Sequence, residues 1–159
     1  SGGETVTGSH GMTVVPDGEL GHSDPDLVVV PGGGWNDRAE TGTWAEAERG
    51  DLPRRLADCH ADGTTVAAVC TGGMLLARAG LLDGRPAITP GEAVPDLRET
   101  AADVVDARVV DDGDVVTCGG VTAGIDLALV LVEREFGAAL ADGIADAMEH
   151  TRRGPVHRR

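Results

Sequence analysis

The clearest feature in the pattern of apolar and polar residues is a short apolar run that ends at a cysteine and continues as a helix. Residues 65–69 are β-branched or apolar, which is typical of a buried strand. Cys70 follows, then Gly72 and Gly73, and then apolar residues at helical spacing as far as Ala79. This order predicts a strand, a sharp turn and a helix, with the thiol at the corner, as in nucleophile elbows.

A cysteine at such a corner has two interpretations. A thiol that faces the N-terminus of the following helix is favoured as the thiolate, which is the reactive form. The alternative is a structural cysteine at a strand end, because cysteine is often buried. The local pattern around Cys70 does not separate the two.

Other apolar runs predict strands that alternate with helices. Residues 26–31 form a continuous aliphatic run, as in a parallel strand covered on both faces. Further strands are predicted at 5–7, 12–15, 86–89, 104–105, 107–110 and 115–118, and helices at 35–61 (two pieces joined at 50–51), 94–102, 123–136 and 138–150. This alternation predicts an α/β sandwich with a mainly parallel sheet. We expect one domain over residues 1–151 and a basic, flexible tail over 152–159.

Three predicted strands end at glycine-rich turns, at residues 32–34, 70–73 and 118–120. Glycine turns at strand ends are common packing devices. However, ligands of open α/β sheets bind beyond the carboxyl ends of the strands. Because one of the three turns carries a thiol, we expect them to form the rim of one pocket.

Charge and composition exclude several kinds of partner. The formal net charge is -14, and all thirteen basic residues are arginine. A field of this sign repels nucleic acids and anionic membranes, so we expect neither as a partner. An acidic chain without lysine fits a halophilic protein in a salt-rich cytoplasm, and a GC-rich coding bias would also replace lysine with arginine.

The remaining composition points to a cytoplasmic protein without a bound cofactor. Three cysteines without paired spacing argue against a disulfide framework and a zinc site. No run of about 18 apolar residues is present, and no signal peptide opens the chain, so no membrane span is expected. No phosphate-binding glycine motif and no metal-ligand spacing of histidines occurs, so we expect no nucleotide, cofactor or metal.

Four segments together resemble the ThiJ/PfpI superfamily, which has the class I glutamine amidotransferase-like fold. They are Val30–Gly33, Ala68–Gly73, Ala79–Arg85 and Gly120–Ala128, and their order and spacing match the family over nearly the whole chain. The nearest branch is the one of isonitrile hydratases and of sensor domains in transcription regulators. The resemblance implies a flavodoxin-like three-layer sandwich, a homodimer and a small-molecule substrate.

The resemblance also implies a set of site residues. Cys70 would be the nucleophile, and the backbone N–H groups of Gly33 and Thr71 would form the oxyanion hole. The Thr71 hydroxyl would either contact substrate or sulfur, or cap the following helix.

The chain departs from the family pattern at two places. Pro90 stands where family members with a cysteine–histidine pair carry the histidine, and proline cannot transfer a proton. The family's first strand and helix, with an acidic residue that bonds the cysteine, would precede the present first residue. We expect such residues in the native protein, since the sheet would otherwise lack a central strand.

Other candidate residues have mainly structural interpretations. Asp126 lies in a predicted first helical turn, where a carboxylate stabilises the helix dipole. Cys118 is either a resolving thiol for Cys70 or a small buried residue. Trp35 either lines the pocket or packs under the next helix. His60 is expected to face solvent, and His10 to lie outside the pocket.

Three functions therefore remain open. The first is a cysteine-dependent enzyme of the hydratase, deglycase or amidase type that acts on a small electrophile through Cys70. The second is a non-catalytic thiol sensor or ligand-binding domain, which suits the absence of a histidine. The third is a structural, dimer-forming domain whose pocket has lost its function.

Overall fold

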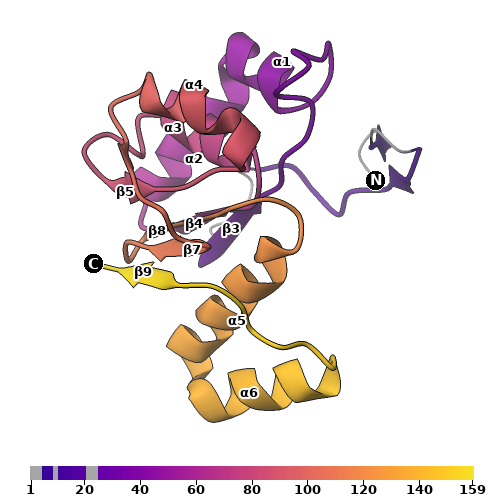
Figure 1. Cartoon of the computed structure of the whole chain (residues 1–159). Coiled ribbons are helices and arrows are strands. Elements are labelled where there is room, and N and C mark those ends of the chain that lie inside the picture. Colours follow the sequence, from indigo (N-terminus) through magenta and orange to yellow (C-terminus); the bar gives the residue numbers. More distant parts are fainter. Residues whose placement is uncertain (1–4, 9–10, 21–24) are drawn as a thin grey trace.

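The computed structural model describes residues 5–8, 11–20 and 25–159, and its centre is a five-stranded sheet (Figure 1). The strand order is β3-β4-β8-β7-β9. The strands are β3 (Leu27–Val30), β4 (Thr65–Ala68), β7 (Val109–Asp111), β8 (Val115–Cys118) and β9 (Val156–Arg158). β3, β4 and β8 run parallel, while β7 is antiparallel to β8 and parallel to β9.

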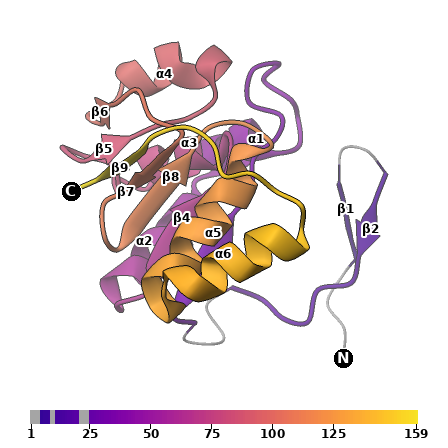
Figure 2. The ribbon, with the colours of Figure 1, turned by 60° about the horizontal axis from the view of Figure 1, so that its bottom comes forward.

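Helices cover the sheet on both faces (Figures 1 and 2). One layer holds α1 (Thr43–Arg49), α2 (Asp51–Ala61), α3 (Gly72–Arg78) and α4 (Val94–Arg98), and the other holds α5 (Ala123–Phe136) and α6 (Ala138–Ala147). This arrangement confirms the predicted three-layer α/β sandwich with a mainly parallel sheet. Within the described residues, no helix has the length and apolar character needed to cross a bilayer.

Four short strands lie outside the main sheet. β1 (Val6–Thr7) and β2 (Thr13–Val14) pair as an antiparallel hairpin, which stands away from the body of the molecule in Figure 2. β5 (Pro86–Ala87) and β6 (Asp103–Val104) pair in parallel, and the 3₁₀ turn η1 (Gly91–Ala93) leads into α4.

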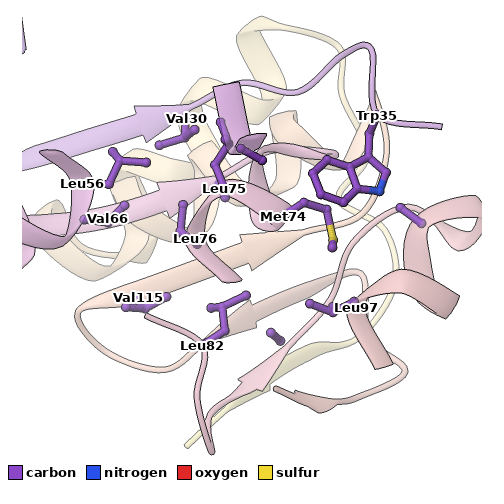
Figure 3. Close-up of a cluster of buried hydrophobic side chains, with 14 residues drawn as sticks. Val30, Trp35, Leu56, Val66, Met74, Leu75, Leu76, Leu82, Leu97 and Val115 are labelled. Carbon is purple, nitrogen blue, oxygen red and sulfur yellow. The ribbon is translucent and has the colours of Figure 1, made fainter. Parts of the chain in front are cut away.

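The apolar run of β4 is explained by burial on both of its faces. Val66 and Ala68 belong to the core between the sheet and α1–α4 (Figure 3), whereas Ala67 belongs to the core under α5. Successive strand residues point to opposite faces, so a strand between two helical layers must be apolar at every position.

β3 does not match the prediction of a strand that is covered on both faces. Val30 is buried, but Leu27 and Val29 are 38% and 50% exposed. β3 is an edge strand, and within the described residues no helix covers these two side chains. The predicted strand is therefore confirmed, but the prediction that both of its faces are covered is wrong.

The segment before α1 is a loop instead of the predicted helix from residue 35. Arg38 and Gly42 have positive φ angles of 51° and 108°, which a continuous helix does not allow. The amides of Ala39 and Thr43 bond the carbonyls of Gly34 and Gly33, so the loop closes on itself. The helix begins only at Thr43.

The end of the chain contains a strand that the sequence pattern did not predict. Val156–Arg158 form β9 beside β7, although residues 152–159 were expected to be a flexible tail. Arg152 and Arg158 each form an ion pair with Glu133 of α5, at 2.6 and 3.0 Å. Two of the four arginines in this segment therefore have an acidic partner on α5.

Asp126, in the first turn of α5, anchors this C-terminal segment. Its side chain accepts hydrogen bonds from Arg108 Nε (2.6 Å), His150 Nε2 (3.0 Å) and the Arg153 N–H (3.1 Å). Burial alone would raise the pKa of this carboxyl, but the hydrogen bonds from His150 and Arg108 bring the pKa below its usual value. Asp126 thus lies in the first helical turn, as predicted, and these hydrogen bonds give it a structural role.

The close packing of α3 against β3 predicts a large cost for Gly72→Ala. A Cβ at Gly72 would lie 2.3 Å from the Val30 carbonyl oxygen, and neither backbone can move without disturbing the sheet. We expect the free energy of unfolding in urea to fall by about 3 kcal/mol, as for a severe overpacking substitution.

Gly143→Ala is the matched control for this substitution. Gly143 lies within α6, and nothing lies within 4 Å of a Cβ built there. Alanine at this position should stabilise the protein by about 0.5–1 kcal/mol, because glycine is unfavourable inside a helix. Equal effects of the two substitutions would contradict the close approach at Gly72.

Candidate active site

Cys70 occupies the corner between β4 and α3, as the sequence predicts. Its φ angle is 59°, in the left-handed region, and its side chain is half-buried. The Cys70 N–H bonds the Gly119 carbonyl at 3.2 Å, and the Cys70 carbonyl accepts from the Thr89 hydroxyl at 3.3 Å. A non-glycine residue in this conformation costs on the order of 1 kcal/mol and is typical of functional sites.

The three glycine-rich turns meet around this corner. A Cβ at Gly32 would lie 2.5 Å from the Thr71 nitrogen and 2.9 Å from the Cys70 Cβ, so only glycine allows this approach. Gly119 supplies the carbonyl that bonds Cys70. Directly after the third turn, Val121 has a φ of 41° and is 83% exposed, and this φ is unusual for a β-branched residue.

A closed ring of three hydrogen bonds holds Gly33 against the elbow. The Gly33 N–H donates to the Thr71 Oγ1 at 2.9 Å, and the Thr43 hydroxyl donates to the Gly33 carbonyl at 2.8 Å. The two threonine oxygens are 3.2 Å apart. Since the Thr43 proton is already used, the Thr71 hydroxyl donates to Thr43. Both threonines are 4% exposed, so the ring lies inside the protein.

This ring occupies one of the two N–H groups that were predicted to form the oxyanion hole. Cys70, Gly33 and Thr71 are neighbours, as expected, but the Gly33 N–H is occupied by the Thr71 hydroxyl. The Thr71 N–H has no acceptor among the described residues. The Thr71 hydroxyl makes no capping bond to α3 either, because it belongs to the ring. One of the two predicted N–H donors is therefore free in this state.

No proton-transfer group accompanies Cys70 in the described part of the chain. Pro90, where the resemblance places a histidine, lies against Gly120 and would be 3.7 Å from a Cβ there. In the described ranges, no carboxylate or imidazole hydrogen-bonds the Cys70 sulfur. His150 bonds Asp126, and His10 lies outside the described residues.

His60 is less exposed than the sequence pattern predicts. Its Nε2 lies 2.9 Å from Asp114, and its side chain is only 22% exposed. It belongs to the end of the sheet opposite the elbow, because Asp114 directly precedes β8 while Cys70 follows β4, which is parallel to β8. It is therefore not a partner of Cys70.

Cys118, the last residue of β8, is fully buried next to the elbow. Burial raises the pKa of its thiol to about 11, although a hydrogen bond from the Cys70 backbone opposes the rise. This supports the prediction of a small buried residue. Among the described residues, no group of three or more His, Cys, Asp or Glu is placed to hold a metal ion.

Sequence reasoning missed Thr43 and Thr89. Thr43 follows a glycine at a helix start, and Thr89 lies two residues after the end of β5, which are ordinary positions for threonine. Their hydrogen-bond partners are 10 and 19 residues away, and nothing in the local pattern marks these contacts.

The sequence profile of the DJ-1/PfpI family matches residues 1–134. The chain belongs to the DJ-1/PfpI family. The isonitrile hydratase of Pseudomonas putida is 39% identical over 127 residues, which are 79% of this chain and 52% of the hydratase. The HTH-type transcriptional regulator CdhR of Pseudomonas aeruginosa is 34% identical over 150 residues, 91% of this chain and 41% of the regulator.

A solved structure has the same fold. A ThiJ/PfpI family protein from Pseudomonas syringae superimposes with a TM-score of 0.80 at 30% identity, over 96% of this chain and 61% of that chain. The chain thus spans about half the length of the hydratase and less of the regulator. The relatives of this chain in the DJ-1/PfpI family therefore include both enzymes and regulators.

The environments of the three cysteines predict selective alkylation by iodoacetamide. With a pKa of about 11, roughly one Cys118 in ten thousand is a thiolate at neutral pH, and both Cys118 and Cys59 are buried. Peptide mass spectrometry should therefore find Cys70 modified first, by at least about a hundredfold in rate. Faster modification of Cys118 or Cys59 under native conditions would contradict the described burial.

The hydrogen-bond ring predicts slow exchange of the Gly33 amide. In Thr71→Val the acceptor is lost, so hydrogen exchange at Gly33 should accelerate by about tenfold, corresponding to one ordinary hydrogen bond. Thr71→Ser keeps the hydroxyl and is the control, with exchange close to that of the native protein. Unchanged exchange in Thr71→Val, measured by NMR, would exclude the ring.

Proposed function

We propose that this DJ-1/PfpI family protein is a cysteine-dependent enzyme that acts on a small electrophile, with Cys70 as the nucleophile. The observation that carries the proposal is the half-buried Cys70 in a left-handed conformation beside the Thr71 N–H, for which the described residues provide no acceptor. Strain of this kind persists only where the surrounding structure enforces it, which is common at active sites. The resemblance to an isonitrile hydratase adds support.

The geometry suits addition to a carbonyl or isonitrile carbon. The Cys70 sulfur would form a bond to the carbon, and with a carbonyl substrate the electron pair of the C=O bond would move to oxygen. The Thr71 N–H would stabilise that oxygen, and such a donor contributes about 3 kcal/mol to lowering the barrier. With an isonitrile, the carbon that bonds the sulfur would also take up a proton and become a thioimidate, and water would add to its C=N bond and expel the thiol, which leaves the N-alkylformamide. With an amide, the tetrahedral adduct would expel the amine and leave a thioester, which water would hydrolyse to the acid and the free thiol.

Proton transfer would rely on solvent in this scheme. The thiol loses a proton when it attacks, and the leaving group gains one, but in the described residues no side chain at Cys70 can carry it. A fixed general acid or base typically contributes about 10²–10⁴ in rate, so activity would be modest without one. Small imidazole buffers at constant pH would supply the missing group.

The test uses a small alkyl isonitrile and measures release of the N-alkylformamide by chromatography. In this reaction one water adds to the isonitrile, and no oxidant or reductant is needed. We expect turnover that increases with imidazole concentration and falls at least about a thousandfold in Cys70→Ala.

Cys118→Ser is the matched control for loss of a thiol, because Cys118 is adjacent to the elbow but buried. It should keep most of the activity. The enzyme proposal fails if Cys70→Ala releases formamide as fast as the native protein, or if neither protein exceeds the buffer rate.

A second candidate is a regulatory domain in which the thiol binds or senses a ligand without turnover. Pro90 at the family's histidine position favours it, as does the likeness to the regulator CdhR. Intact mass spectrometry separates the two candidates. A stoichiometric adduct at Cys70 that persists without product release would support the regulatory role.

A further inference from the structure

A pocket of about 600 Å³ lies between α1, α3 and α4, separate from the thiol. We call it the tryptophan pocket, and its main lining residues are Trp35, Arg38, Trp44, Met74, Asp83 and Glu99. Cys70, Gly33 and Thr71 do not line it. Figure 3 shows the Trp35 ring beside the Met74 side chain. The size is that of an ordinary small-molecule site.

The aromatic wall of the pocket is held in a fixed arrangement. The rings of Trp35 and Trp44 meet edge to face, with centroids 5.1 Å apart. Asp96 accepts hydrogen bonds from the Trp35 Nε1 at 2.6 Å and from Arg38 at 2.9 Å. The Arg38 guanidinium lies 3.9 Å from the Trp44 ring centroid, so this wall already holds one cation against an indole face.

The charges around the tryptophan pocket do not balance. Both arginines that line it are paired, Arg38 with Asp96 and Arg78 with Glu48 at 2.5 Å. The other two acidic lining residues, Asp83 and Glu99, have no ion-pair partner among the described residues. The exposed carboxylates of Asp83 and Glu99 therefore carry negative charge that no ion pair with a described residue compensates, whereas Met74 and Trp35 in the same lining are buried.

We propose that the tryptophan pocket binds a small organic cation with an apolar body. The cationic group would face Asp83 and Glu99, and the apolar body would contact Met74 and the indole rings. Neutral and anionic molecules of the same shape would lack the attraction of these carboxylates. This proposal does not depend on chemistry at Cys70.

Tryptophan fluorescence tests this proposal directly. The chain has two tryptophans and no tyrosine, and both tryptophans line the pocket, so the emission reports on this site. The probes are benzylammonium, benzyl alcohol and benzoate, which share one ring and differ in charge. We expect saturable binding of benzylammonium, about tenfold or more tighter than binding of the other two, and weakened by added salt.

The double variant Asp83→Asn/Glu99→Gln removes both charges without changing the shape of these exposed side chains. Its affinity for benzylammonium should fall about tenfold, as expected for two partly exposed charge contacts, and its weak binding of benzyl alcohol should not change. The control is Asp62→Asn/Asp106→Asn, which makes the same change in net charge at exposed positions outside the pocket lining.

Each outcome of these binding measurements either supports or overturns the proposal of a cation site. Loss of affinity in the pocket variant with full affinity in the control supports it. Equal affinity for the three probes, equal affinity of both variants, or no binding by native protein in fluorescence and calorimetry overturns it. Because the probes do not react with thiols, the outcome is independent of the enzyme proposal.

Discussion

The close approach of two backbones, at the end of β3 and the first turn of α3, determines the arrangement of the whole site. Gly72 lies against the Val30 carbonyl, and Gly32 lies against Thr71, with no room for a side chain at either position. This contact fixes where α3 begins relative to the parallel strands. As a result Cys70 must turn through a left-handed conformation, and the Gly33 loop comes within hydrogen-bond distance of the Thr71 hydroxyl.

The strands and long helices were predictable from sequence because their burial is regular. β4 is apolar from Val66 to Ala68 because helices cover both of its faces, and α5 has a long apolar stripe that ends at Gly137. The elbow was predictable for the same reason, since a buried strand, a thiol, two glycines and a helix occur in direct succession. The family pattern then connected the three glycine turns.

The features that could not be predicted depend on partners distant in sequence. Thr43 and Thr71 are 28 residues apart, and only the packing of α1 against α3 brings their hydroxyls together. β9 pairs with β7, and its Arg158 forms an ion pair with Glu133, but neither partner is close in sequence, so this basic segment without a long apolar run gave no indication of a strand. The loop before α1 has helix-forming residues, but Gly33 and Gly34 accept its hydrogen bonds and close it as a turn.

The ring at Gly33 has a consequence for the resting state of the protein. The Thr71 oxygen already occupies the N–H group that the resemblance assigns to substrate. A substrate oxygen can accept a hydrogen bond from the Gly33 N–H only if it displaces the Thr71 hydroxyl, which is an acceptor of similar strength. The Thr71 hydroxyl therefore competes with a substrate for this donor. The free energy gained on binding is then the difference between the hydrogen bond to the substrate oxygen and the hydrogen bond to the Thr71 oxygen. This difference is small for the neutral oxygen of a ground-state carbonyl and larger for a charged oxyanion. If the proposed enzyme function is correct, a site built in this way would bind the transition state more strongly than the reactant without any proton transfer by a side chain.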